Sequence, residues 1–113
     1  MSVRASWNFP SPLTQVPINV NATGDTVLVV GVAGKRIKVF RLKLIVAAAV
    51  VVLIKDGSIT LDGPLSFSAN EGMILDFTDV DMPPWYTTSP GNSLILNSGI
   101  TTQIGGNMDY LLS

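Results

Sequence analysis

Cysteine and histidine are both missing from this chain of 113 residues. Without cysteine there is no disulfide framework, no thiolate nucleophile and no zinc–cysteine site. Without histidine the chain lacks the commonest general base and the commonest transition-metal ligand. These two absences argue against an enzyme. We therefore expect no catalytic residues, no metal site and no cofactor.

Charged residues are scarce, at 13% of the chain, whereas apolar residues make up 47%. A typical soluble domain has about 25% charged residues. One domain of this composition has too few polar groups to cover its surface, which predicts a homo-oligomer or a larger assembly. The net charge is −1, so no overall field attracts nucleic acid, and we expect none as a partner.

Long hydrophobic segments are absent too. The longest apolar run, Leu44 to Ile54, has 11 residues, whereas a membrane-spanning helix needs about 20. The N-terminus also lacks the apolar core of a signal peptide. We expect a protein that is made in the cytoplasm and used without crossing or spanning a membrane.

Short runs rich in Val, Ile and Thr alternate with turn clusters every 8–12 residues or so, and no pattern indicates a helix of more than a turn. Asp56-Gly57 is a strong hairpin signal. We predict an all-β fold, an antiparallel, jelly-roll-like β-sandwich of eight to nine short strands. The sandwich domain spans residues 18–113. An extended N-terminal arm spans residues 1–17, because its prolines, the last at Pro17, remove backbone donors.

The chain is organised around residues 35–56, KRIKVFRLKLIVAAAVVVLIKD. β-Branched residues favour strands over a long helix here, and the three alanines predict a bend between two strands. Charges fall on both faces of the first strand, which predicts a twist or bulge and indicates an edge strand. The second strand, Val50 to Lys55, is predicted to be central and buried.

Five of the seven basic residues lie within nine positions at the start of this stretch, at Lys35, Arg36, Lys38, Arg41 and Lys43. These residues either contact an acidic protein surface or belong to a solvated edge strand, where lysines prevent unwanted pairing with another strand. Asp76, Asp79 and Asp81 form an acidic loop. Their carboxylates are either solvated or bind calcium. In a homo-oligomer, residues 35–43 of one subunit could face residues 76–81 of another.

Large aromatic side chains mark two further candidates for contact. Trp7 and Phe9 lie in the arm, which either folds over its own sandwich or docks on a neighbouring subunit. Trp85 and Tyr86 follow a double proline, and they either plug one end of the sandwich or form a recognition surface.

Three segments resemble the small capsid cement or decoration proteins of tailed bacteriophages. They are TGDTVLVVGVAGKRIKVFRLKLIV from Thr23, KDGSITLDGPLSFSANEGMIL from Lys55, and WYTTSPGNSLILNSGITTQIGGNMDYLL from Trp85. These are patterns of strands and turns rather than catalytic signatures. Similar pieces also occur in head fibres and tail accessories.

The resemblance implies a non-enzymatic, jelly-roll-like virion protein on the outer surface of the phage head. It would bind the major capsid protein as a homo-oligomer, a trimer or dimer, and clamp neighbouring copies. The expected contact residues are Trp7, Phe9, Lys35, Arg36, Lys38, Arg41, Trp85 and Tyr86. The alternative is a receptor- or glycan-binding β-module of a head fibre or tail accessory, with Asp76, Asp79 and Asp81 beside the aromatic loop.

Overall fold

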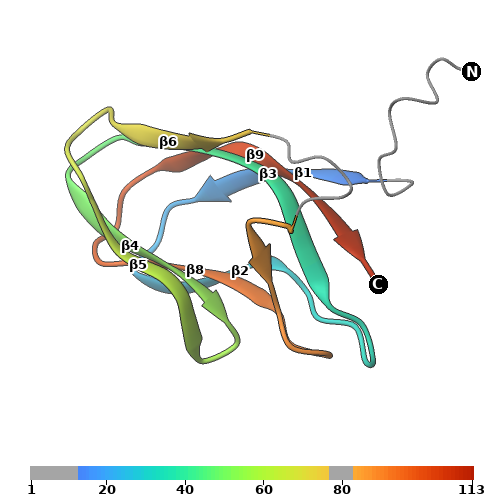
Figure 1. Ribbon diagram of the computed structural model, residues 1–113. Helices are drawn as coiled ribbons and strands as arrows, with labels where there is room; N and C mark the ends of the chain where they lie inside the picture. Colours follow the sequence, from blue (N-terminus) through green and yellow to red (C-terminus); the bar gives the residue numbers. More distant parts are fainter. Residues whose placement is uncertain (1–12, 77–82) are drawn as a thin grey trace, which may run out of the picture.

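A computed structural model describes residues 13–76 and 83–113. Within these residues nine strands form two antiparallel sheets packed face to face (Figure 1). The first sheet has the order β1 (Thr14–Val20), β9 (Ile104–Leu112), β3 (Ile37–Val46) and β6 (Gly72–Leu75), and β7 (Tyr86–Thr87) also pairs with β3. The second has the order β2 (Gly24–Val29), β8 (Leu94–Ser98), β4 (Val50–Asp56) and β5 (Ile59–Phe67). The predicted all-β antiparallel sandwich is confirmed.

Strands from the first part of the chain pair with strands from the last part in reverse order. β1 pairs with β9, β2 with β8, β3 with β6, and β4 with β5. β3 also pairs with β9, and β4 with β8, which joins these ribbons into the two sheets. No helix occurs in the described residues, so none of them forms one that could cross a membrane.

The core lies between the two sheets and follows the period-2 alternation of the strands. The inward positions of β3, β4, β8 and β9 include Leu42, Leu44, Ile54, Leu96, Ile104 and Met108, each 0% exposed. Burying one such side chain contributes roughly 1.5–3 kcal/mol. The inward face of β9 is apolar, since Ile104 and Met108 are core residues and Tyr110 and Leu112 pack against them.

The stretch from Lys35 to Asp56 forms two strands with a bend at the alanines, as predicted. β4 lies between β8 and β5, so its predicted central position is confirmed. The prediction that the first strand is an edge is wrong, because β3 lies between β9 and β6. A bulge at Phe40 separates the pairs Val39–Tyr110 and Arg41–Asp109. This extra residue shifts the alternation, so that Lys38, Arg41 and Lys43 share the outer face.

The proposed boundary between arm and sandwich at residue 17 is also corrected. β1 begins at Thr14, and Pro17 lies opposite Asn107 within the ladder. Proline is tolerated there because β1 is an edge strand, so one side of its backbone needs no partner. Residues 1–12, with Trp7 and Phe9, lie outside the described residues.

Two further segments differ from what their residue types suggest. Asp62-Gly63-Pro64 has the composition of a turn, but it lies within β5, where the register against β4 shifts between Val52 and Ile54. The segment Thr26 to Val32 is β-branched and apolar, but it is not uniformly buried. β2 is an edge strand that ends at Val29, and Val27 and Val30 are 51% and 72% exposed.

Candidate binding surface

The outer face of the first sheet carries a row of cations along β3. Lys38, Arg41 and Lys43 are half-buried side chains on this face, while Ile37, Val39, Leu42 and Leu44 point into the core. The row exists because of the bulge at Phe40. Without it, Lys38 would lie on the face opposite to Arg41 and Lys43.

Arg41 is held in place by neighbours on β9. Its guanidinium donates a hydrogen bond to Asn107 Oδ1 at 2.6 Å and lies 3.9 Å from Asp109 Oδ2. Asp109 is on the outer face, but it is buried beneath this contact. Such a restrained guanidinium loses less side-chain entropy when a partner binds than a free one.

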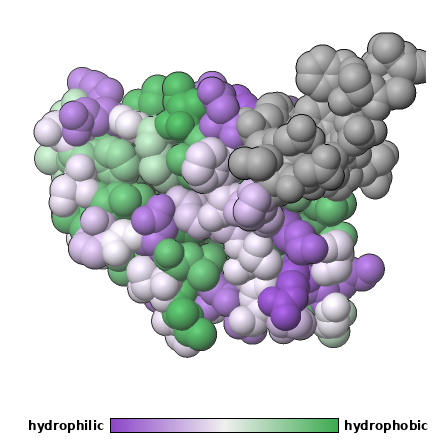
Figure 2. Space-filling model, in the orientation of Figure 1, coloured by the Kyte–Doolittle hydropathy of each residue, from purple (hydrophilic) through white to green (hydrophobic). Residues whose placement is uncertain are grey.

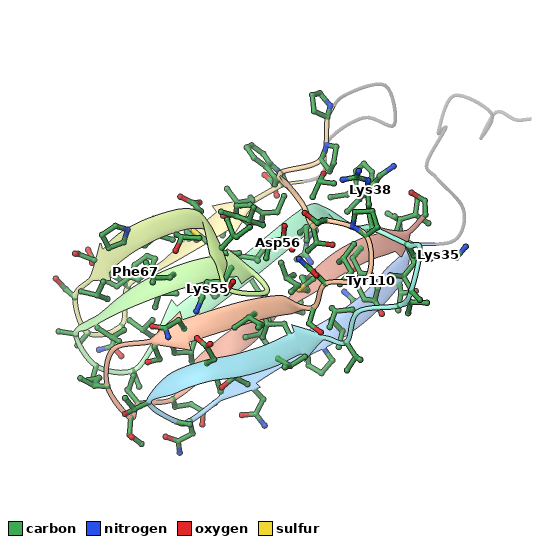
Figure 3. The ribbon with its side chains drawn as sticks, turned by 90° about the horizontal axis from the view of Figure 1, so that it is seen from below. Lys35, Lys38, Lys55, Asp56, Phe67 and Tyr110 are labelled. Carbon is green, nitrogen blue, oxygen red and sulfur yellow. The ribbon has the colours of Figure 1, made fainter. Side chains whose placement is uncertain are left out.

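Lys35 and Arg36 are exposed and lie in the connection before β3. The Arg36 N–H donates to the Ser113 carbonyl at 2.8 Å, and the Lys35 carbonyl accepts from Gly91 N–H at 2.9 Å. Figure 3 shows Lys35 and Lys38 at the end of the sandwich near Tyr110, whereas Phe67 lies at the other end. Two predicted contact residues, Lys35 and Lys38, therefore lie at the same end of the sandwich.

Trp85 and Tyr86 differ in exposure: one is at the surface and the other is buried. Trp85 is 45% exposed, and its indole Nε1 donates to the Asp76 carbonyl at 2.7 Å. Tyr86 is buried, and its hydroxyl donates to Asp62 Oδ2 at 2.6 Å. Burial first, and then this bond and the Asp62 charge, raise the pKa of Tyr86. Tyr86, one of the expected contact residues, is buried because neighbouring strand residues point to opposite faces and Tyr86 takes the inward one.

Exposed isoleucines beside the cationic row are the surface feature that sequence reasoning missed. Ile45 and Ile74 are 54% and 65% exposed and lie on β3 and β6. A shallow hollow over Gly105 and Gly106 flanks Lys43 and Ile45 on one side, and another over Gly72 flanks them on the other. Both hollows have glycines in their lining, and glycine has no side chain to fill the space above the sheet. Figure 2 shows hydrophobic side chains where β6 lies in Figure 1.

The outer face of the second sheet carries a different polar arrangement. Lys55 Nζ lies 3.1 Å from Asp25 Oδ1, which also accepts from Asn97 Nδ2 at 2.7 Å. The bond from Asn97, followed by that from Lys55, lowers the pKa of Asp25. These groups satisfy one another across β2, β8 and β4, which leaves the first sheet as the face with cations arranged in a row.

The acidic loop offers little for metal chemistry within the described residues. Asp76 is exposed, and Asp79 and Asp81 lie outside the described part of the chain. Among residues 13–76 and 83–113, no group of three or more acidic, histidine or cysteine side chains is placed to hold a metal ion.

Comparisons of this chain with protein-family models, with curated proteins and with solved structures found no match. The resemblance to phage cement proteins therefore stays a prediction, and the surface itself is the basis for a functional proposal.

Proposed function

We propose that this chain is a structural virion protein, a capsid cement or decoration subunit without enzymatic activity. It binds the outer surface of a phage head and clamps neighbouring major capsid proteins. The observation that carries the proposal is the outer face of the first sheet, where Lys38, Arg41 and Lys43 lie in a row near exposed isoleucines. A broad, shallow surface that is both apolar and basic suits a protein lattice with acidic patches better than a small ligand.

The nested strand pairing supports the proposal further. Eight of the nine strands pair first with last in nested order, and a jelly roll, an architecture found in viral capsid proteins, would require nested pairing of this kind. The closely packed core makes the subunit a rigid clamp. Many copies that each bury modest surface hold the lattice together by avidity, because one contact can release only while the others hold.

The test uses purified heads that are stripped of the protein and then given it back. We expect heads with the protein to survive heating that opens heads without it. Equal survival with and without the protein would rule out a cementing role. Deleting residues 1–12 and repeating the assay tests the arm, including Trp7 and Phe9; unchanged head binding would show that the arm makes no contact.

Charge variants test directly whether the basic face, formed by the cations on and just before β3, contacts the head. Lys35→Gln with Lys38→Gln is expected to weaken head binding by roughly 3- to 30-fold at low salt, because each contact between exposed charges contributes about 0.2–1 kcal/mol and copies act together. Thr60→Glu with Ser66→Glu is the matched control. It changes net charge by the same amount on exposed positions of the second sheet. If both double variants bind heads as the wild type does, the basic face is not the contact.

A second candidate, a receptor- or glycan-binding module of a head fibre or tail accessory, is favoured by one observation. Trp85 is exposed and its indole N–H donates to the backbone carbonyl of Asp76, and an exposed aromatic face held in this way is suited to stacking on a sugar ring. Binding to a glycan array that Trp85→Ala abolishes would support this second candidate. If the wild-type protein binds no glycan on the array, the second candidate is wrong.

A further inference from the structure

The edges of the two sheets differ in how they are protected against pairing with another chain. β1 carries Pro17 and β5 carries Pro64, while β2 carries Asp25 and is interrupted by a bulge at Leu28. β6 has the sequence GMIL, with neither proline nor charge. Prolines, charges and bulges are the usual means by which natural proteins block edge pairing. Among the described edge strands longer than the two-residue β7, β6 alone lacks all of them.

The register of β6 shows which of its backbone groups are free. Val46 N–H donates to the Glu71 carbonyl at 2.8 Å, and Leu44 and Leu42 lie opposite Met73 and Leu75. In an antiparallel ladder, hydrogen-bonded pairs alternate with non-bonded pairs. Met73 and Leu75 therefore bond to β3. The N–H and C=O groups of Gly72 and Ile74 point away from it, toward the open edge.

We propose that β6 of one copy pairs antiparallel with β6 of a second copy, about a two-fold axis at Ile74. Ile74 then exchanges both backbone hydrogen bonds with Ile74 of the partner subunit. Gly72 pairs with Asp76 of the partner subunit on either side of the axis. This register uses the outward backbone groups of Gly72 and Ile74 and the N–H of Asp76, whose carbonyl also accepts a hydrogen bond from the Trp85 indole within its own chain. The two first sheets become one continuous sheet.

The side chains on both faces of this pairing are complementary. On the inner side, half-buried Met73 lies opposite Leu75 of the partner subunit, so each covers apolar surface that is partly open in the single chain. On the outer side, the two exposed Ile74 side chains meet at the axis. Neighbouring strands lie about 4.8 Å apart, which is close enough for both contacts.

The hollow over Gly72 gives the second copy a specific place for a charge. Lys43, Ile45 and Ile74 surround this hollow. In the proposed register, the carboxylate of Asp76 of the partner subunit lies directly above Gly72, on the same face as Lys43. Because Gly72 has no side chain, the ammonium group of Lys43 can approach that carboxylate. The axis repeats the pair, so two opposite-charge contacts flank the isoleucines.

This inference names the contact behind the homo-oligomer that the proposed function invokes, but it depends only on the fold. A dimer that does not bind phage heads would remove the proposed function and leave the pairing intact. A monomer that binds heads would do the reverse.

The first experiment measures mass in solution over a wide concentration range by light scattering or sedimentation. We expect the wild type to dimerise and Ile74→Lys to raise the dissociation constant roughly tenfold or more, since each tenfold corresponds to about 1.4 kcal/mol. Ile59→Lys is the matched control, because Ile59 is similarly exposed, at 59%, but lies on β5. A monomeric wild type, or a dimer that Ile74→Lys does not weaken, would overturn the proposal.

Cross-linking tests the register and does not depend on the lysine variant folding well. The native chain has no cysteine, so Ile74→Cys introduces a single thiol. Hydrogen-bonded antiparallel pairs have Cα atoms about 5.5 Å apart, a distance that a disulfide spans. Mild oxidation is expected to link Ile74→Cys into dimers and to leave Ile59→Cys unlinked. Equal linking of both variants, or of neither, contradicts pairing at β6.

Charge exchange tests the contact over Gly72. Lys43→Asp alone is expected to weaken the dimer several-fold, because it places two carboxylates side by side. Adding Asp76→Lys is expected to restore the affinity. If the double variant is weaker than Lys43→Asp alone, Lys43 and Asp76 do not meet across the axis.

Discussion

Asp56 is one of two buried carboxylates in the described residues, and it ends β4 at the turn into β5. Its Oδ2 accepts from the Ser89 N–H at 2.9 Å and from the Ser89 hydroxyl at 3.0 Å. Burial alone raises the pKa of Asp56, but hydrogen bonds from Asn92 and Ser89 and the charge of Arg36 outweigh it and lower the pKa. One carboxylate thus ties the 89–92 turn to the second sheet.

This lowered pKa predicts how stability depends on pH. The unfolded chain takes up the proton at a higher pH than the folded chain, so the contribution is present above the ordinary carboxyl pKa of 3.8 and is lost as pH falls below it. We expect the melting temperature to fall steeply below about pH 4. Asp56→Asn should lower the free energy of unfolding by about 2 kcal/mol at pH 7. It should also reduce the loss of stability that accompanies a fall in pH.

Thermal unfolding followed by circular dichroism from pH 3 to 7 checks this prediction. Asp25→Asn is the comparison variant, and its effect at pH 7 should be smaller because the Asp25 side chain is 47% exposed. An Asp56→Asn variant with the stability and pH profile of the wild type would contradict the account.

At the scale of elements, β9 organises the first sheet because it lies between β1 and β3. Two consecutive glycines in it have different surroundings. A Cβ on Gly106 would strike the carbonyl oxygen of Lys43 in β3, whereas a Cβ on Gly105 would have only the Ile18 carbonyl oxygen nearby, at 4.0 Å. The close approach between β9 and β3 therefore depends on Gly106.

Alanine substitutions at these neighbouring positions should therefore differ sharply. Gly106→Ala is expected to cost about 3 kcal/mol or more of unfolding free energy, because the obstacle is backbone rather than a side chain that can rotate away. Gly105→Ala should change stability by less than about 1 kcal/mol. Denaturant unfolding measures both. Equal stability of the two variants would show that β3 and β9 separate more easily than the packing implies.

For the whole molecule, the pairing of first strands with last strands has a kinetic consequence. β1 pairs with β9 from Thr14 opposite Tyr110 to Val20 opposite Ile104, so the first sheet cannot close until the ends of the chain meet. Loop-closure entropy must be overcome before such contacts form, and sandwiches with distant pairings fold in milliseconds to seconds. Removing β9 deprives both β1 and β3 of a partner.

We therefore expect refolding in stopped-flow fluorescence on a timescale of roughly milliseconds to seconds. A chain that ends before Ile104 should show no cooperative unfolding transition, because the core would lose Ile104 and Met108 as well as the central ladder. Cooperative unfolding of that shortened chain, or refolding in microseconds, would contradict this view.

Most local features, namely strands, a hairpin and a bend, could be predicted from the sequence alone. β-Branched runs predicted the strands, Asp56-Gly57 predicted the hairpin between β4 and β5, and the three alanines predicted the bend after β3. These predictions succeed because backbone preference and side-chain alternation act between near neighbours. The acidic loop and the aromatic pair were recognised as candidates, although sequence could not assign their side chains to a face.

Only the tertiary structure decided which strands lie at the edges and which side chains reach the surface. A strand's neighbours come from distant parts of the chain, so charges on both faces of residues 36–46 suggested an edge, whereas β3 is central. The bulge at Phe40 brings Lys38 to the outer face with Arg41 and Lys43, and the ladder turns Tyr86 inward and Trp85 outward. The same physical reason leaves β6 open at its edge: register is set by partners across the sheet, and no local pattern specifies them.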